Sequence, residues 1–157
     1  MIFISWNCRG SGSKIKEEAM KDINKIVKLD ILLLQETKLE DIDLLKASKI
    51  FWKKGNGTTM SSRRASRGLG TFWDTSKFDL LEEEKFTHWI FTKLLQNHSD
   101  FHVSLFNLHV PVLFFEKRDC WDSLNSFLSK HRPENILIAG DLNVTLSQSE
   151  KKGGSPV

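Results

Sequence analysis

Short apolar runs alternate with stretches of helical periodicity along the first part of the chain, and this order predicts an α/β fold. Ile2–Trp6 predicts a strand, and Ile15–Lys28 places apolar side chains on one helical face. Ile31–Leu34 is a continuous apolar run, which is typical of a fully buried strand. A strand, a helix and a second strand indicate a crossover connection, so we expect a parallel or mixed sheet covered by helices.

The rest of the chain predicts a loop, two helices and five more strands. Gly55–Gly68 is rich in Gly, Ser, Thr and Arg and predicts a mobile loop. Helices are expected at Asp41–Ser48 and at Glu116–Lys130, the second ending at His131-Arg132-Pro133. The expected strands, of which the middle three are expected to be antiparallel, are Leu69–Trp73, Phe78–Glu82, Trp89–Leu95, Phe101–Leu108 and Ile136–Ala139.

Four polar motifs follow apolar runs directly, at the carboxyl ends of predicted strands. Strand ends that meet at one sheet edge would gather oxygen ligands and amides, which a metal-assisted attack on a phosphodiester requires. In the last motif, Gly140 would let the backbone approach a ligand closely. The motifs are Trp6-Asn7-Cys8-Arg9-Gly10, Gln35-Glu36-Thr37, Asn107-Leu108-His109-Val110-Pro111 and Gly140-Asp141-Leu142-Asn143.

Each polar residue in these motifs has a chemical and a structural interpretation. A carboxylate beside a buried run, as at Glu36 and Asp141, is costly unless it faces an opening or meets a cation, but either could simply cap a loop. The amides of Asn7 and Asn143 could orient a water or a phosphate oxygen, although Asn is also a common turn residue. His109 could donate to a phosphate oxygen or be structural.

Length and composition are those of one ordinary globular domain. The chain has 157 residues, 39% of them hydrophobic and 27% charged, and no apolar run approaches the ~20 residues that span a bilayer. No signal sequence is evident, and two cysteines make no disulfide framework, so we expect a nuclear or cytoplasmic protein without membrane partners. Two histidines, His98 and His102, raise the alternative of a zinc site. They lie four residues apart in a predicted hairpin turn, but no acid or cysteine ligand follows them, so we interpret them as surface residues of the turn.

The net charge of +3 conceals a basic block between Leu44 and Trp73, a stretch without a single Asp or Glu. A local concentration of positive charge suits a surface that binds a polyanion, although a solvated loop would have the same composition. The basic block consists of Lys46, Lys49, Lys53, Lys54, Arg63, Arg64 and Arg67.

Taken together and in this order, the motifs resemble those of the endonuclease/exonuclease/phosphatase superfamily. The likeness lies in Trp-Asn-Cys-Arg-Gly at 6–10, Leu-Gln-Glu-Thr-Lys at 34–38 and Gly-Asp-Leu-Asn at 140–143. Further stretches at 67–70, 115–118 and 149–154 resemble the endonuclease region of plant LINE-type (non-LTR) retrotransposons in particular. The resemblance extends from residue 2 to about residue 154.

The resemblance implies a four-layered α/β sandwich, with two mixed sheets flanked by helices, over residues 1–146 and a loose polar tail at 147–157. It also implies an endonuclease that acts on DNA, with an oligomeric state that the sequence leaves open. Arg9 stands where repair members of the family carry an acid, which favours the retroelement branch. The residues expected to contact DNA are Arg9, Arg63, Arg64 and Arg67.

For the site, the resemblance implies Mg²⁺, with Mn²⁺ as a possible substitute, held by Glu36 and Asn7. Asp141 would orient and deprotonate the attacking water, and Asn143 would steady the nucleophile or a phosphate oxygen. His109 falls where the family usually has a Tyr; both can donate a hydrogen bond, but the charge of an imidazole changes near neutral pH.

The end of the chain departs from the family pattern. The sixteen residues after Asp141 contain one acid, Glu150, and no histidine, whereas the family supplies a further Asp and commonly an Asp-His pair there. The resemblance therefore implies a C-terminally truncated endonuclease with an incomplete sheet and low or no activity. Three alternatives stay open: a catalytically inactive nucleic-acid-binding remnant, a phosphatase or lipid phosphodiesterase of the same superfamily, and a decayed reading frame.

Overall fold

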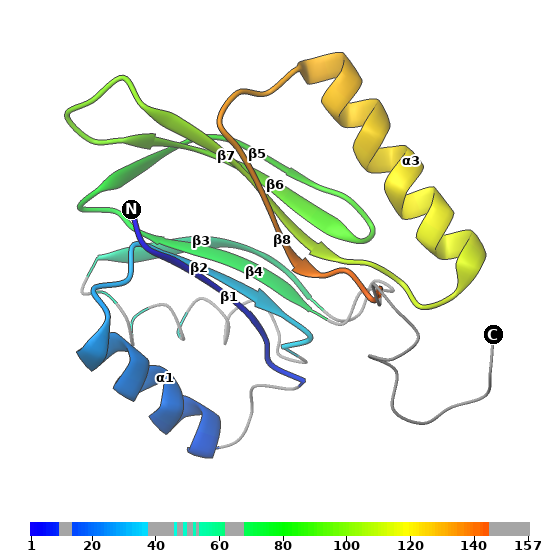
Figure 1. The fold of residues 1–157 in the computed structure, drawn as a ribbon. Coiled ribbons are helices and arrows are strands. Elements are labelled where there is room, and N and C mark those ends of the chain that lie inside the picture. The colour runs from blue at the N-terminus through cyan, green and yellow to red at the C-terminus, as the bar shows by residue number, and fades with distance from the viewer. Residues whose placement is uncertain are drawn as a thin grey trace.

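The structure is a computed structural model that describes residues 1–9, 14–37, 54–61 and 68–144, together with the single positions 46, 49 and 52. Among the described elements, two four-stranded sheets face each other, and a helix lies on the outer face of each (Figure 1). The predicted four-layered α/β sandwich with two mixed sheets is therefore confirmed. None of the described helices is both long enough and apolar enough to cross a bilayer.

The first sheet has the strand order β1-β2-β4-β3. Its opening strands β1 and β2 are parallel and are joined through α1, as the sequence predicts, while β4 runs antiparallel to both β2 and β3. The elements of this half are β1 (Phe3–Asn7), α1 (Lys14–Ile26), β2 (Ile31–Gln35), β3 (Gly55–Met60) and β4 (Leu69–Asp74).

The second sheet has the order β5-β6-β7-β8. The first three strands are an antiparallel meander, as predicted, and β8 adds to β7 in parallel after the crossover through α3. Helix α3 ends at His131, and the next residue, Arg132, has a φ of 45°, the left-handed conformation that caps many helices. The elements are β5 (Phe78–Lys85), β6 (Trp89–Gln96), β7 (His102–His109), α3 (Phe114–His131) and β8 (Ile136–Asp141).

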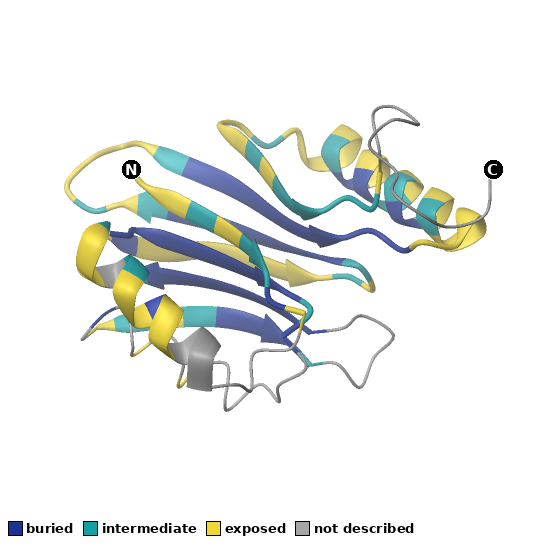
Figure 2. Cartoon of the chain, turned by 60° about the horizontal axis from the view of Figure 1, so that its bottom comes forward, coloured by how far each residue is buried: buried dark blue, intermediate teal, exposed yellow. Residues whose placement is uncertain are grey.

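Four apolar clusters lie among the described residues, three large ones and a small one of Met60, Leu69 and Ile90, and Figure 2 shows the resulting burial of the central strands. The cluster between the sheets includes Leu33 and Leu105, both fully buried. A second cluster lies beneath α3 around Phe106 and Phe127, and a third surrounds Met20 on α1. Because apolar residues alternate along β7 between two of these clusters, the strand is covered on both faces.

The predicted loop Gly55–Gly68 is wrong in its first half, because Gly55–Met60 is strand β3, paired with β4. The glycine at position 57 has a packing role here: a Cβ there would lie 2.2 Å from the ring of Phe72, so only a glycine admits that ring. Thr58 and Thr59 are β-branched and buried, as suits a strand. The Gly- and Thr-rich composition thus reflects close packing of a strand and not a loop.

A buried polar side chain connects the two sheets. Asn107 of β7 is fully buried and donates to the carbonyl oxygens of Leu34, at 3.2 Å, and Gly70, at 2.9 Å, in the first sheet. Its Oδ1 accepts from Gln35 Nε2 at 2.7 Å. Buried amides of this kind are costly unless every group is bonded, so this set of bonds fixes how β7 lies across β2.

Several predictions fall on residues that the structure does not describe. They include most of the expected helix Asp41–Ser48, the arginines Arg63, Arg64 and Arg67, and the tail 147–157. The domain boundary near residue 146 also lies beyond the described residues and stays a prediction.

Candidate metal and phosphodiester site

The inner faces of three strands, and the residue that follows a fourth, bring candidate side chains to one end of the sandwich. On β1, β7 and β8 every second side chain points between the sheets, and the last inner positions are Asn7, His109 and Asp141. His109 and Asp141 are direct neighbours in the parallel register of β7 and β8, and Asn7 is paired with Gln35 on β2. The predicted meeting of strand ends therefore involves both sheets.

Glu36 reaches the same place because the backbone breaks the alternation of β2. Gln35 faces the second sheet, so an extended residue 36 would point the opposite way. The φ of Glu36 is instead 52°, a left-handed conformation that costs a residue with a Cβ about 1–2 kcal/mol. The side-chain oxygen Oε1 lies 3.2 Å from Asn7 Nδ2 as a result. Strain at this position serves the geometry of the site.

The amide of Asn7 joins two carboxylates from different sheets. Its Nδ2 donates to Glu36 Oε1 at 3.2 Å and to Asp141 Oδ2 at 2.5 Å. Its Oδ1 accepts the backbone N–H of Arg9 at 3.1 Å. In this orientation the Nδ2 of Asn7 holds the two carboxylates together. For Asn7 to bind a metal as predicted, its amide would have to rotate so that Oδ1 faced the carboxylates. That role stays a prediction.

Asp141 is held at both carboxylate oxygens. Asn7 donates to Oδ2, and the backbone N–H of Asn143 donates to Oδ1 at 3.0 Å. The side chain of Asn143 donates to the carbonyl of Val110 at 2.6 Å, while its own carbonyl accepts from Lys117 Nζ at 2.7 Å. Asn143 therefore ties the loop after β8 to the end of β7 and orients Asp141 through its backbone.

The backbone at Gly140 lies very close to the neighbouring strand β7. The residue has a φ of 142°, and a Cβ there would lie 2.0 Å from the carbonyl oxygen of Leu108 on β7. The sequence favoured an approach of this backbone to a ligand, but the structure places a strand there. Gly140 acts on the site by letting β8 pair closely enough with β7 to put Asp141 beside His109.

Glu36, His109 and Asp141 can contribute one metal-binding atom each, and the three atoms lie within 4.8 Å of one another. Ligands on opposite sides of an octahedral Mg²⁺ are ~4.2 Å apart at a metal–oxygen distance of ~2.1 Å. Small side-chain movements would therefore suffice, and two carboxylates are a suitable donor set. His109 is 7% exposed, and its buried Nδ1 has no hydrogen-bond partner among the described residues. The residues present fit a divalent cation.

A cleft of about 220 Å³ opens beside this cluster. Pockets that enclose a whole small-molecule ligand usually have volumes of ~300–1,000 Å³, so this cleft is too small for that. Its size suits one phosphate group in the backbone of a larger substrate. Its wall includes Glu36, His109 and Asn143, but also His88 and Glu116, which the sequence did not single out as site residues. Burial lowers the pKa of His88, although the negative charge of Glu116 acts in the opposite direction.

The sequence around His88 and Glu116 does not by itself indicate that either residue lies at a site. Glu116 follows Pro111 by five residues at the start of a predicted helix, and His88 precedes a strand; neither adjoins a motif that indicates chemistry by itself. The outer lip of the cleft is apolar, since Val112 and Leu113 line it and are 73% and 65% exposed. Phe114 continues this exposed surface onto α3.

A larger hollow of about 380 Å³ lies at the opposite strand ends. Its charged groups Asp30 and Lys77 form an ion pair with each other, so they do not gather about an open position. The chemistry-bearing residues of the described chain are concentrated at the smaller cleft.

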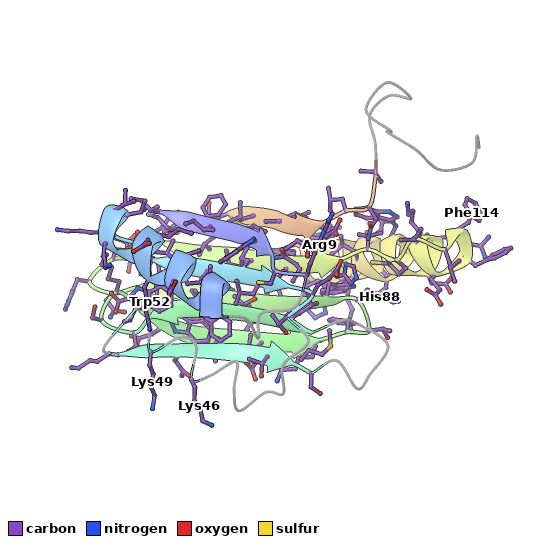
Figure 3. The ribbon with its side chains drawn as sticks, turned by 90° about the horizontal axis from the view of Figure 1, so that it is seen from below. Arg9, Lys46, Lys49, Trp52, His88 and Phe114 are labelled. Carbon is purple, nitrogen blue, oxygen red and sulfur yellow. The ribbon has the colours of Figure 1, made fainter. Side chains whose placement is uncertain are left out.

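Lys46 and Lys49, two described members of the basic block, do not lie at the cleft. Figure 3 shows Lys46 and Lys49 pointing outward on one side of the molecule, well separated from Arg9 and His88. Arg9 is exposed and follows the end of β1, so it is the one predicted DNA-contacting residue that the described chain places beside the candidate site.

A model of the Endonuclease/Exonuclease/phosphatase family matches residues 4–156. The chain belongs to this family. The resemblance that the motifs indicated is thus confirmed, and the match covers both sheets and the four motifs. No curated protein matches the sequence.

Solved structures of the family share the fold. A Bacteroides thetaiotaomicron endonuclease/exonuclease/phosphatase family protein is 18% identical, with a TM-score of 0.67, and the match covers 94% of this chain and 65% of that one. The AP endonuclease of Leishmania major is 19% identical (TM-score 0.67; 98% and 58% covered). The endonuclease domain of TRAS1, a telomere-specific non-LTR retrotransposon, is 11% identical (TM-score 0.66; 91% and 59% covered). The chain therefore spans less than two thirds of the length of these relatives.

Proposed function

We propose that this chain is the metal-binding part of a phosphodiesterase that cleaves DNA, of the kind found in non-LTR retrotransposons. One observation carries the proposal: Asn7, Glu36, His109 and Asp141 converge from two sheets at the edge of a cleft. Family membership and the similarity to an AP endonuclease and a retrotransposon endonuclease support the substrate class.

Glu36 and Asp141 would hold the cation, which we take to be Mg²⁺ or, in its place, Mn²⁺. When bound, the cation supplies charge neutralisation for the phosphoryl group and the leaving oxygen. Asn7 keeps the two carboxylates, which repel each other, in a single arrangement by donating to both. This arrangement lowers the cost of ordering the site before substrate arrives.

Asp141 would bind the cation through one carboxylate oxygen and, we propose, orient and deprotonate the attacking water with the other. Its carboxylate cannot rotate freely because Asn7 and the Asn143 N–H hold one oxygen each, and fixed geometry is the first requirement of a general base. Asn143 lines the cleft, where its amide could steady the nucleophile or a phosphate oxygen. Arg9 would contact a flanking phosphate. His109 would either donate to a phosphate oxygen or bind the cation.

The test is nicking of supercoiled plasmid with Mg²⁺. This assay detects a single cut per molecule, so it responds to slow cleavage as well as to fast cleavage. Asp141→Asn should abolish nicking. Asp79→Asn removes the same charge from an exposed position on β5, away from the cleft, and should leave nicking unchanged. Equal nicking by wild type and Asp141→Asn would refute the proposed site.

A phosphatase of the same superfamily predicts phosphate release from small esters without nicking. A catalytically inactive nucleic-acid-binding remnant predicts DNA binding that weakens steeply with salt and survives Asp141→Asn, with no nicking by the wild type. Both outcomes would replace the endonuclease proposal.

A further inference from the structure

The cluster at the cleft contains an imidazole as well as two carboxylates, and this changes which cation it should prefer. His109 offers a ring nitrogen within 4.8 Å of the carboxylate oxygens of Glu36 and Asp141. Its side chain cannot move far, since it is 7% exposed and belongs to the last residue of a strand bonded on both sides. The backbone N–H of His109 also donates to the carbonyl of His88 at 2.9 Å.

One nitrogen of this imidazole has no hydrogen-bond partner among the described residues. Its Nδ1 is buried and makes no hydrogen bond within the described chain, an arrangement that buried polar atoms rarely tolerate. A cation bound at Nδ1 would give this buried nitrogen the partner that it lacks. The neighbouring carboxylates supply the negative charge that such a cation requires.

We propose that His109 is a metal ligand, so that the site is a mixed imidazole–carboxylate centre which favours the later first-row transition ions, such as Co²⁺, over Mg²⁺. This inference rests on the proposed metal site and adds its third ligand. Mg²⁺ takes oxygen ligands, whereas imidazole suits transition ions, whose affinity for such donors rises from Mn²⁺ to Co²⁺. A carboxylate-only site would gain no such preference from residue 109.

The experiment measures cation binding directly, by isothermal titration of the chain with Mn²⁺, Co²⁺ and Mg²⁺ in turn, without DNA. His109→Tyr keeps a ring and a hydrogen-bond donor but removes the nitrogen ligand. It should weaken Co²⁺ binding by about 10–100-fold, the usual scale for groups that tune a metal centre, weaken Mn²⁺ binding by less, and change Mg²⁺ binding by less than about 3-fold. His88→Gln removes an imidazole that lines the same cleft outside the cluster, so it should leave all three affinities within about 3-fold.

A second measurement does not depend on how His109→Tyr folds. Electron spin echo modulation of Mn²⁺ bound to the wild type should contain ¹⁴N coupling from one imidazole. Mn²⁺ that binds in an Asp141-dependent way without this coupling would overturn the role of His109 and leave the proposed metal site standing. If none of the three cations binds the wild type, the proposed metal site itself fails.

Discussion

Replacing Asn107 by alanine should loosen the contact between the two sheets on which the candidate site depends. The change deprives Gln35 Nε2 of its 2.7 Å acceptor and the carbonyls of Leu34 and Gly70 of their donor, all within the core. Each buried group left without a partner costs about 1–3 kcal/mol. Gln35 keeps a 3.2 Å bond to Ser5 Oγ and carbonyls tolerate partial bonding, so we take the low end. The free energy of unfolding should fall by about 3 kcal/mol.

The assay is urea denaturation followed by tryptophan fluorescence, with a thermal melt as the second measure. A loss of about 3 kcal/mol corresponds to a melting temperature lower by about 6–12 °C for a domain of this size. Asn125→Ala makes the same substitution on an exposed position of α3, where alanine favours the helix, and should change stability by less than about 0.5 kcal/mol. If Asn107→Ala costs under about 1 kcal/mol, the buried amide does not hold the sheets together and the reasoning fails.

Four further outcomes follow from individual residues. Gly140→Ala should destabilise by about 2–5 kcal/mol in denaturation, because its Cβ would meet the carbonyl of Leu108 at a φ of 142°. Burial raises the pKa of Cys120 to about 11, so the native thiol should react with Ellman's reagent at pH 8 far more slowly than the unfolded one. Burial alone would raise the pKa of Asp30, but hydrogen bonds from Lys77 and a backbone N–H hold this pKa below its usual value. Asp30→Asn should therefore lower the free energy of unfolding above about pH 4. The difference in stability between the variant and the wild type should vanish as the pH falls through the lowered pKa. A divalent cation at 100 times its Kd should stabilise the chain by about 2.7 kcal/mol, seen as a higher melting temperature that chelation reverses.

Most of the order of helices and strands could be predicted from the sequence, because local patterns of apolar residues determine it. Apolar runs such as Ile31–Leu34 and the helical spacing from Trp121 to Leu128 need no tertiary information, and the strand-end positions of Glu36 and Asp141 follow from them. Strand β3 could not be predicted in this way, because its glycine is selected by the ring of Phe72, a contact from another strand.

The details of the site depend on contacts between residues far apart in the chain. The left-handed backbone at Glu36 has no local signal, since glutamate is not a residue that favours positive φ. Asn7 was predicted as a ligand, but 134 residues separate it from its partner Asp141, and only the packing of the sheets shows that its donors face the carboxylates. His88 and Glu116 join the cleft through that packing as well.

The proposed metal cluster of Glu36, His109 and Asp141 is divided between the two sheets, so metal binding there would depend on how the sheets pack. Glu36 belongs to the end of β2 in the first sheet, while His109 and Asp141 belong to the second, so a cation held by all three would connect the layers. The Asn107–Gln35 bond lies one residue before Glu36 and two before His109, so it helps to set the distance between these two proposed ligands. A change that lets the sheets slide would therefore weaken cation binding without touching a ligand, and a bound cation would in turn resist that sliding.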